Sequence, residues 1–192
     1  MDNSKAKKDF ITAFWFLYEK NPVEKISIRK LCEIAGYNRS TFYNHFGSIY
    51  VLLDAAIDDL FADSDFPALD CRSIPELASV SRDVVPAALA QLEKDRHYIS
   101  LLIRNHNEGI LKERLKNMFL SHLTIQHVEK YPRISLILEY HLSACMSVIV
   151  KWFHEDSDIS EVELADLIYD LTQNGSLPSL FKEIGLMEGL DD

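Results

Sequence analysis

The chain has 192 residues, 47% of them hydrophobic, and a formal net charge of −10. This length can bury a sizeable core in one domain or in two closely joined ones. Its three cysteines are odd in number and lack motif spacing, which argues against a secreted disulfide scaffold.

The first predicted helix covers Phe10 to Tyr18, an apolar stretch preceded by lysines. A signal peptide has a similar beginning, but residues 19–22 (Glu-Lys-Asn-Pro) offer no small-residue cleavage site. Phe10, Phe14 and Leu17 also form one stripe of a helix. We therefore interpret this stretch as a core helix of the N-terminal domain.

Residues 27–46, SIRKLCEIAGYNRSTFYNHF, predict two short helices joined by a tight turn. The apolar face of the first helix has the spacing i, i+3, i+4, i+7: Ile28, Leu31, Cys32 and Ala35. Ser27 is its expected N-cap, with a hydroxyl that accepts from a backbone N–H. Gly36 is its expected stop, since glycine enters the left-handed region without a Cβ clash.

The second helix is expected to begin at Arg39, capped by Asn38. Phe42 and Phe46 share one face and should pack inward on three residues: Leu31, Ile34 and Tyr37. The opposite face carries groups that bind base edges and phosphates: Ser40, Thr41, Tyr43 and Asn44. This pattern is typical of a helix-turn-helix, whose second helix enters the DNA major groove. An ordinary αα-hairpin with a polar outer face is the alternative.

Within this pattern the individual residues are more specific. AGYNRSTFYNHF resembles the recognition segment of the TetR family of bacterial one-component regulators, typically A-G-v-s-r-g-t-f-Y-x-h-F. ISIRKLCEIAG resembles the usual lead-in of that family, and VLLDAAIDDLF resembles its following linker helix. The close match covers residues 8–62. Beyond it, the likeness is one of length and helical character.

By position, the resemblance implies that Arg39, Ser40 and Thr41 contact bases. Tyr43 and His45 would then hold phosphates, with Arg29 approaching the groove from the supporting helix. The predicted DNA-binding residues are Ser27, Arg29, Asn38, Arg39, Ser40, Thr41, Tyr43, Asn44 and His45.

One position departs from the family pattern. Members commonly place a phosphate-binding lysine three residues after the final Phe, and this chain has Ile49 there. The missing cation is expected to weaken DNA binding and to flatten its salt dependence.

Charge is distributed unevenly along the chain. Residues 1–50 hold eight Lys and Arg against five Asp and Glu, a net charge of +3, so the remainder carries −13. A basic segment is expected where a protein meets nucleic acid, and an acidic remainder discourages indiscriminate binding. For the acidic part alone, a merely solvated surface is an equal explanation.

The predicted fold is all-α. Residues 1–48 would form a three-helix DNA-binding domain with the helix-turn-helix, and residues 49–192 a helical ligand-binding and dimerisation domain. We expect a loop at 63–75, because it holds two prolines, and a kink at Pro86. The expected later helices cover residues 48–62, 75–94, 95–106, 108–131, 134–153 and 159–171.

The helix at 134–153 is apolar around most of its circumference, so both of its sides must be covered. The helix at 159–171 adds a further set of apolar residues. In TetR-like proteins the two late helices form a four-helix bundle across a two-fold axis, which implies a homodimer. Its recognition helices, about 34 Å apart, would match half-sites one helical turn apart. The central helix of a monomer is the alternative. The predicted interface residues are Leu138, Leu142, Cys145, Ile149, Trp152, Leu164, Ile168 and Leu171.

The resemblance also implies a ligand cavity in the C-terminal domain, whose occupation shifts the spacing of the two DNA-reading domains. The candidate lining residues are Tyr98, Arg104, Phe119, His122, Tyr140 and His141. Plain core packing is the alternative for each. His141 and Cys145 have a spacing suited to a metal ion, but buried, hydrogen-bonded histidines are the preferred interpretation, and no metal or cofactor is predicted.

The sequence shows no phosphate-binding glycine loop, HExxH, CxxC or G-x-S-x-G motif, and no apolar run as long as a membrane span. It therefore predicts a cytoplasmic DNA-binding regulator rather than an enzyme. We expect a ligand-responsive repressor that binds a palindromic operator as a dimer. The alternative is a regulator of the same fold controlled by a protein partner, open to activation as well as repression.

Overall fold

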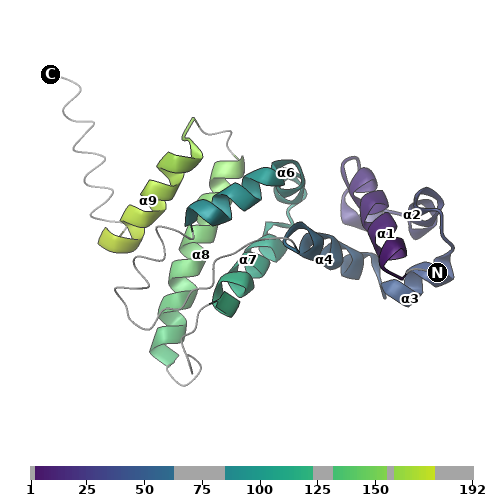
Figure 1. The fold of residues 1–192 in the computed structure, drawn as a ribbon, viewed down its shortest axis with the longest axis horizontal. Helices are drawn as coiled ribbons and strands as arrows, with labels where there is room; N and C mark the ends of the chain where they lie inside the picture. The colour runs from purple at the N-terminus through teal and green to yellow at the C-terminus, as the bar shows by residue number, and fades with distance from the viewer. Residues whose placement is uncertain (1–2, 63–84, 123–131, 155–157, 176–192) are drawn as a thin grey trace. The chain divides into compact units, whose positions relative to one another are not determined.

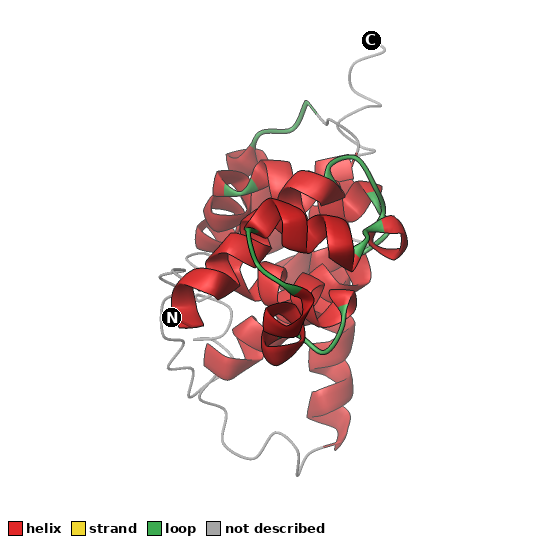
Figure 2. Ribbon diagram, turned by 90° about the vertical axis from the view of Figure 1, so that its right-hand side faces the viewer, coloured by secondary structure: helices red, strands yellow, loops and turns green. Residues whose placement is uncertain are grey.

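The computed structural model describes residues 3–62, 85–122, 132–154 and 158–175 of the chain. Every regular element within these residues is a helix, as Figure 2 shows, so the predicted all-α class is confirmed. The α-helices labelled in Figure 1 are α1 (Asn3–Tyr18), α2 (Ile28–Ala35), α3 (Arg39–His45), α4 (Ile49–Leu60), α6 (Arg96–Arg104), α7 (Glu108–His122), α8 (Pro132–His154) and α9 (Glu161–Asn174). The 3-10 helix η1 (Val23–Lys25) lies between α1 and α2 in the chain.

Residues 85–94 are helical as well. The expected loop at 63–75 and parts of two expected helices, 75–84 and 123–131, lie outside the described residues. No helix of the described part has the length and apolarity that crossing a membrane requires.

The chain divides into two compact units. The first comprises Met1–Ser64 with His97–Leu111, and the second comprises Asp65–Arg96 with Lys112–Asp192. The first unit therefore contains α6 in addition to α1–α4. The domain boundary predicted at residue 48 stays a prediction.

An aromatic layer forms the core of the first unit. The Phe10 side chain is fully buried, and its ring centroid lies 5.6 Å from that of Phe42 and 5.8 Å from that of Phe46. Phe42 and Phe46 are buried too, which confirms that this face of α3 points inward. Ile34 is different: it is 42% exposed. The expectation that it receives the phenylalanines is wrong, because Ile34 lies outside the apolar stripe of α2.

Helix α6 belongs to the same core. Leu101 and Leu102 are buried in the cluster that contains Phe10 and Phe14. At the beginning of α6, the ring centroid of Tyr98 lies 4.6 Å from that of Trp15 on α1. The first unit is therefore completed by a segment that follows α4 by more than thirty residues.

The second unit is built around α8 and α9. Leu142 and Ile149 on α8 are buried, as are Leu164 and Ile168 on α9. The N-terminus of α9 is fixed by a reciprocal capping box. In it Glu163 N–H donates to Ser160 Oγ over 3.3 Å, and Ser160 N–H donates to Glu163 Oε2 over 2.8 Å.

Arg96 is held against the end of α8. Its guanidinium carbon lies 4.9 Å from the ring centroids of both Trp152 and Phe153, a cation–π arrangement. Its Nε also donates to the Glu93 carboxylate, 2.6 Å from Oε1. The Trp152 indole N–H donates to the Ile159 carbonyl over 2.7 Å. This tie fixes the chain entering α9.

Candidate nucleic-acid interface

The turn between α2 and α3 requires a glycine. Gly36 has a φ of 78°, in the left-handed region, where a side chain with a Cβ is strained. The N–H groups of Gly36 and Tyr37 both donate to the Cys32 carbonyl over 3.0 Å. This confirms Gly36 as the stop of α2, and it gives the turn one compact conformation.

Asn38 caps α3 as predicted. Its side-chain Oδ1 accepts from the Thr41 N–H over 2.8 Å and from the Thr41 hydroxyl over 3.0 Å. The cap satisfies one N–H of the first turn. It also uses the hydroxyl proton of Thr41, which leaves that hydroxyl to act toward a ligand as an acceptor.

Ser27 behaves differently from the prediction. It is the N-cap residue of α2 by its backbone, but its side chain makes no capping hydrogen bond. The expectation that its hydroxyl accepts from the helix is therefore wrong. Because Ser27 is exposed, its hydroxyl lies at the surface near the positive end of α2, where a phosphate oxygen would be favoured.

The outer face of α3 is polar and exposed, with the buried Phe42 behind it. Tyr43 is 54% exposed, and three further side chains of this face are exposed: Arg39, Ser40 and Asn44. Thr41 and His45 are half-buried. The His45 ring lies 6.3 Å from that of Phe10, so the core orients the imidazole.

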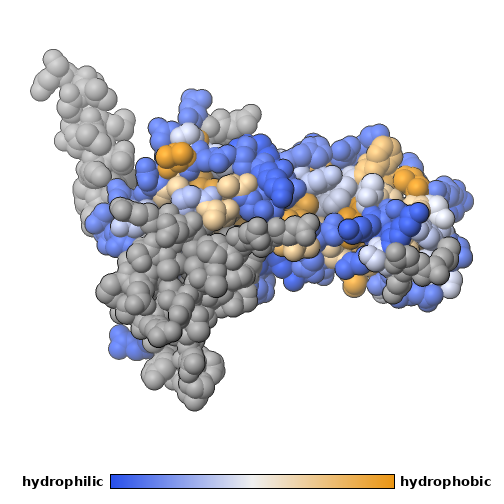
Figure 3. Space-filling view, in the orientation of Figure 1, coloured by the Kyte–Doolittle hydropathy of each residue, from blue (hydrophilic) through white to orange (hydrophobic). Residues whose placement is uncertain are grey.

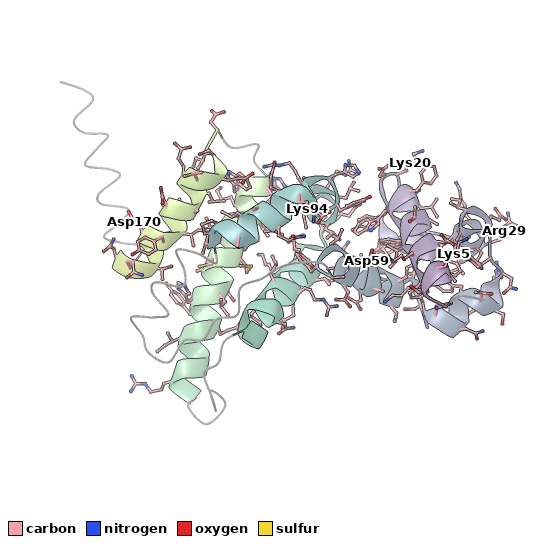
Figure 4. All side chains as sticks on the ribbon, in the orientation of Figure 1. Lys5, Lys20, Arg29, Asp59, Lys94 and Asp170 are labelled. Atoms are coloured by element: carbon pink, nitrogen blue, oxygen red, sulfur yellow. The ribbon has the colours of Figure 1, made fainter. Side chains whose placement is uncertain are left out.

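Exposed cations occur on the helices beside this face, among them Lys5 on α1 and Arg29 on α2. Arg29 on α2 is exposed, and its Nε lies 3.3 Å from Glu33 Oε1. Such an exposed pair is weak, so a phosphate could replace the carboxylate. In Figure 4, Lys5 and Arg29 lie beside α2 and α3, whereas Lys20 lies at the other end of α1. There the Lys20 ammonium stacks on Phe16, 4.7 Å from the ring centroid.

The first turn of α4 contains a residue that the sequence did not single out. Ser48 caps this helix, its Oγ accepting from the Val51 N–H over 3.3 Å. Ile49 is half-buried against the core of the first unit, which explains an aliphatic residue there. The next residue, Tyr50, is 52% exposed. Its phenol therefore lies one residue after the position at which the family pattern has its lysine. From the sequence, Tyr50 could have been recognised only as a tyrosine in the first turn of a helix that begins with a capping serine.

On the face shown in Figure 3, hydrophilic side chains cover much of the described surface of the first unit, and apolar side chains appear as separate patches. An exposed polar helix over an aromatic layer, flanked by cations, has the features of a nucleic-acid interface. The comparisons with known proteins bear on the fold that carries it.

No family model and no curated protein matches the chain. Its structure is similar to the crystal structure of a TetR-family transcriptional regulator from Streptomyces coelicolor, with a TM-score of 0.57 and 18% sequence identity. The similarity covers 90% of this chain and 80% of the other. The chain has the TetR fold. At this identity the likeness concerns the fold alone.

Within the TetR fold, the predicted ligand-binding residues are dispersed. Tyr98 contacts Trp15, and Arg104 Nη2 donates to the Glu19 carbonyl over 2.9 Å, so both side chains are engaged with α1 and its end. Tyr140 is 73% exposed. A ligand-binding role for these three residues stays a prediction. The side chains of Phe119 and His122 lie outside the described residues.

Among the candidates whose side chains are described, His141 has partly buried polar surroundings. Its Nε2 lies 3.7 Å from Cys145 Sγ and 3.5 Å from Thr172 Oγ1. Burial lowers the pKa of His141 and raises the pKa of Cys145 to about 11, so both groups are neutral at pH 7. Among the described residues, no cluster of three His, Cys, Asp or Glu side chains could hold a metal ion.

Most of the residues that we predicted at a dimer interface are buried within the single chain. Five are buried within the chain itself: Leu142, Ile149, Trp152, Leu164 and Ile168. These side chains pack in the core of this chain, and their role in a dimer interface stays a prediction. Cys145 and Leu171 are half-buried, and the Leu138 side chain lies outside the described residues. Among the described side chains of α8 and α9, the large hydrophobic ones that are exposed are Leu136, Ile137, Tyr140 and Val162.

Proposed function

We propose that the protein is a transcriptional regulator that recognises a DNA operator with α3. The observation that carries the proposal is the polar outer face of α3, oriented by the buried Phe42 and Phe46. Gly36 and Asn38 define where the helix begins relative to α2. A short, firmly supported helix with an exposed N-terminal turn is what the major groove admits.

Arg39 and Ser40 are the proposed base-contacting residues, since both are exposed in the first turn of α3. An arginine there can donate two hydrogen bonds to guanine O6 and N7. Thr41 accepts rather than donates, because its proton is held by Asn38. Asn44 lies on the same face one turn later.

The proposed phosphate contacts surround these residues. Tyr43 and His45 lie on α3, and Ser27 and Arg29 lie at the beginning of α2. Such contacts fix the register of the protein on DNA without carrying sequence information themselves. Tyr50 at the capped start of α4 is a further contact that we propose from its exposure.

We propose a homodimer formed through the exposed apolar side chains of α8 and α9. Leu136, Ile137 and Tyr140 lie within one and a half turns of α8, and Val162, on α9, is 72% exposed. A two-fold arrangement of these helices would remove that apolar surface from water. It would also pair two copies of α3 for a palindromic operator, with half-sites about 34 Å apart.

For control of binding, we propose a small-molecule effector in the second unit and repression of the target gene. The exposed apolar residues of α8 and α9 favour a second candidate, a protein partner that covers the same surface. Two measurements separate these candidates. A stoichiometric second protein found by mass analysis of the purified protein favours the protein partner. A small compound that raises the melting temperature favours the small-molecule effector.

The test of DNA recognition is a selection of bound duplexes from a random pool, followed by titration of the selected sequence. We expect enrichment of a palindrome and tight binding at low salt. Arg39→Ala should bind that sequence more weakly, whereas Lys20→Ala, which removes a cation from the far end of α1, should bind almost as the unaltered protein does. If no sequence is enriched, the proposed function is wrong.

A further inference from the structure

Tyr37 connects the turn before α3 to the first helix of the chain. Its hydroxyl donates to Asp9 Oδ2 over 2.8 Å, across 28 residues of sequence. Its ring also packs against Phe10, with the two centroids 5.3 Å apart. Both Tyr37 and Asp9 are half-buried. The residue is therefore held at its ring and at its hydroxyl.

Two neighbours make the position of Tyr37 significant. Gly36 before it is in the left-handed conformation, and Asn38 after it caps α3. A rotation of the chain at this turn would swing the first turn of α3, where Arg39 and Ser40 are exposed. Because Phe10 also contacts Phe42, α1 supports the turn and the helix after it at the same time.

The bond to Asp9 is stronger than a neutral one. A phenol that donates to a carboxylate makes a charge-assisted hydrogen bond, about twice as strong as one between neutral groups. The same bond raises the pKa of Tyr37 above its ordinary value. The TetR pattern has valine at the place of Tyr37, and valine has no group that could make this bond.

We infer that Tyr37 and Asp9 are positioning residues for DNA recognition: their bond sets the orientation in which α3 presents Arg39 and Ser40. The inference rests on the proposed function. Neither residue needs to touch DNA. Loss of the bond lets the beginning of α3 sample several orientations, which weakens directional base contacts more than it weakens phosphate contacts, because those depend chiefly on charge.

The readout that isolates this role is the specificity ratio, the dissociation constant for a scrambled duplex divided by that for the selected operator. Tyr37→Phe keeps the ring on Phe10 and removes only the hydroxyl. We expect it to lower the ratio by about five-fold, the equivalent of one hydrogen bond. The salt dependence of binding should not change, because no phosphate contact is lost.

Substitutions of Asp9 test the role of the carboxylate that accepts this hydrogen bond. Asp9→Ala removes a negative charge, which strengthens binding to all duplexes alike, so only the ratio reports on positioning. It should fall as it does for Tyr37→Phe, and the double variant should fall no further, since both changes break the same bond. Asp9→Asn keeps an oxygen that accepts from Tyr37, and it should restore much of the ratio.

Thr12→Val is the matched control on α1. It removes the exposed hydrogen bond from Thr12 Oγ1 to the Lys8 carbonyl, which has no connection with α3, and it should leave the ratio unchanged. The inference is overturned if Tyr37→Phe lowers the melting temperature while the ratio stays the same. It is also overturned if Tyr37→Phe flattens the salt slope by about one contact, because Tyr37 would then bind phosphate itself. If the unaltered protein prefers no sequence, the proposed function fails, and the inference fails with it.

Discussion

The side-chain amide of Asn107 donates to the hydroxyl of Tyr18 over 2.7 Å, across 89 residues of sequence. Tyr18 is fully buried at the end of α1, so its hydroxyl needs a partner within the protein. Nearby, His97 Nε2 lies 3.0 Å from Glu19 Oε1. Residues 97–111 thus supply polar partners as well as leucines to the unit that carries α3.

Asn107→Ala should destabilise the protein by about 1–3 kcal/mol, since it leaves the Tyr18 hydroxyl buried without its donor. Tyr18→Phe should cost less, about 1 kcal/mol, because Asn107 retains its bond to the Asn105 carbonyl. Urea unfolding of both variants measures the two costs. The opposite order would mean that the hydroxyl has another partner.

Stability should fall at alkaline pH. Burial raises the pKa of Tyr18 to about 12, while a tyrosine in the unfolded chain has a pKa of about 10. Between these values the unfolded chain loses a proton that the folded chain keeps, so the contribution is complete below pH 10 and is lost as the pH rises toward 12. The free energy of unfolding, measured from pH 8 to 11, should fall less steeply for Tyr18→Phe than for the unaltered protein.

Ile49→Lys should strengthen DNA binding and steepen its salt slope by close to one contact. It should also cost about 1 kcal/mol of stability, because Ile49 is half-buried against the core. Val51→Lys is the control, since Val51 is exposed in the same turn of α4. Equal slopes for the two variants would show a general charge effect rather than a contact at residue 49.

Tyr140→Asp should convert a dimer into a folded monomer. The Tyr140 side chain is exposed within one chain, so the change disturbs no internal packing, but it places a charge in the proposed apolar interface. Sedimentation measures the mass, and circular dichroism checks that the helices persist. Phe16→Asp makes the same kind of change on an exposed aromatic of the first unit, and it should remain a dimer.

Arg39→Ala and Tyr43→Phe should separate base contact from phosphate contact. The first should cost about 1–3 kcal/mol in operator affinity and relax the preference at one base pair per half-site. The second should weaken binding to all sequences alike. Titrations against single-base variants of the operator measure both. A changed operator preference in Tyr43→Phe would contradict the role proposed for Tyr43.

Local interactions made the helix-turn-helix predictable. The inward phenylalanines, the stop at Gly36 and the cap at Asn38 each depend on residues at most four positions apart, and all three are confirmed. The two local errors have equally local causes. Ile34 lies off the apolar stripe of α2, and Ser27 takes the capping position without making the capping bond.

The sequence predicted the positions of the later helices, but it did not predict which face of each helix is buried. Hydrophobic periodicity locates a helix, yet in α8 apolar residues occur on most sides, so the sequence cannot say which of them the chain covers itself. The structure buries Leu142 and Ile149 and exposes Leu136 and Tyr140. Several residues predicted at the interface are therefore buried within this chain, and Tyr140, predicted as a ligand contact, is exposed within it.

The helical class and the segment proposed to bind DNA could thus be read from the sequence, because short-range spacing and turn chemistry specify them. The packing of α6 into the first unit and the bond between Tyr37 and Asp9 became visible only in the folded chain. Hydrogen bonds between residues 28 or 89 positions apart leave no periodic pattern in the sequence from which they could be predicted. They exist because burial requires a partner for each polar group, and the folded chain brings that partner within reach.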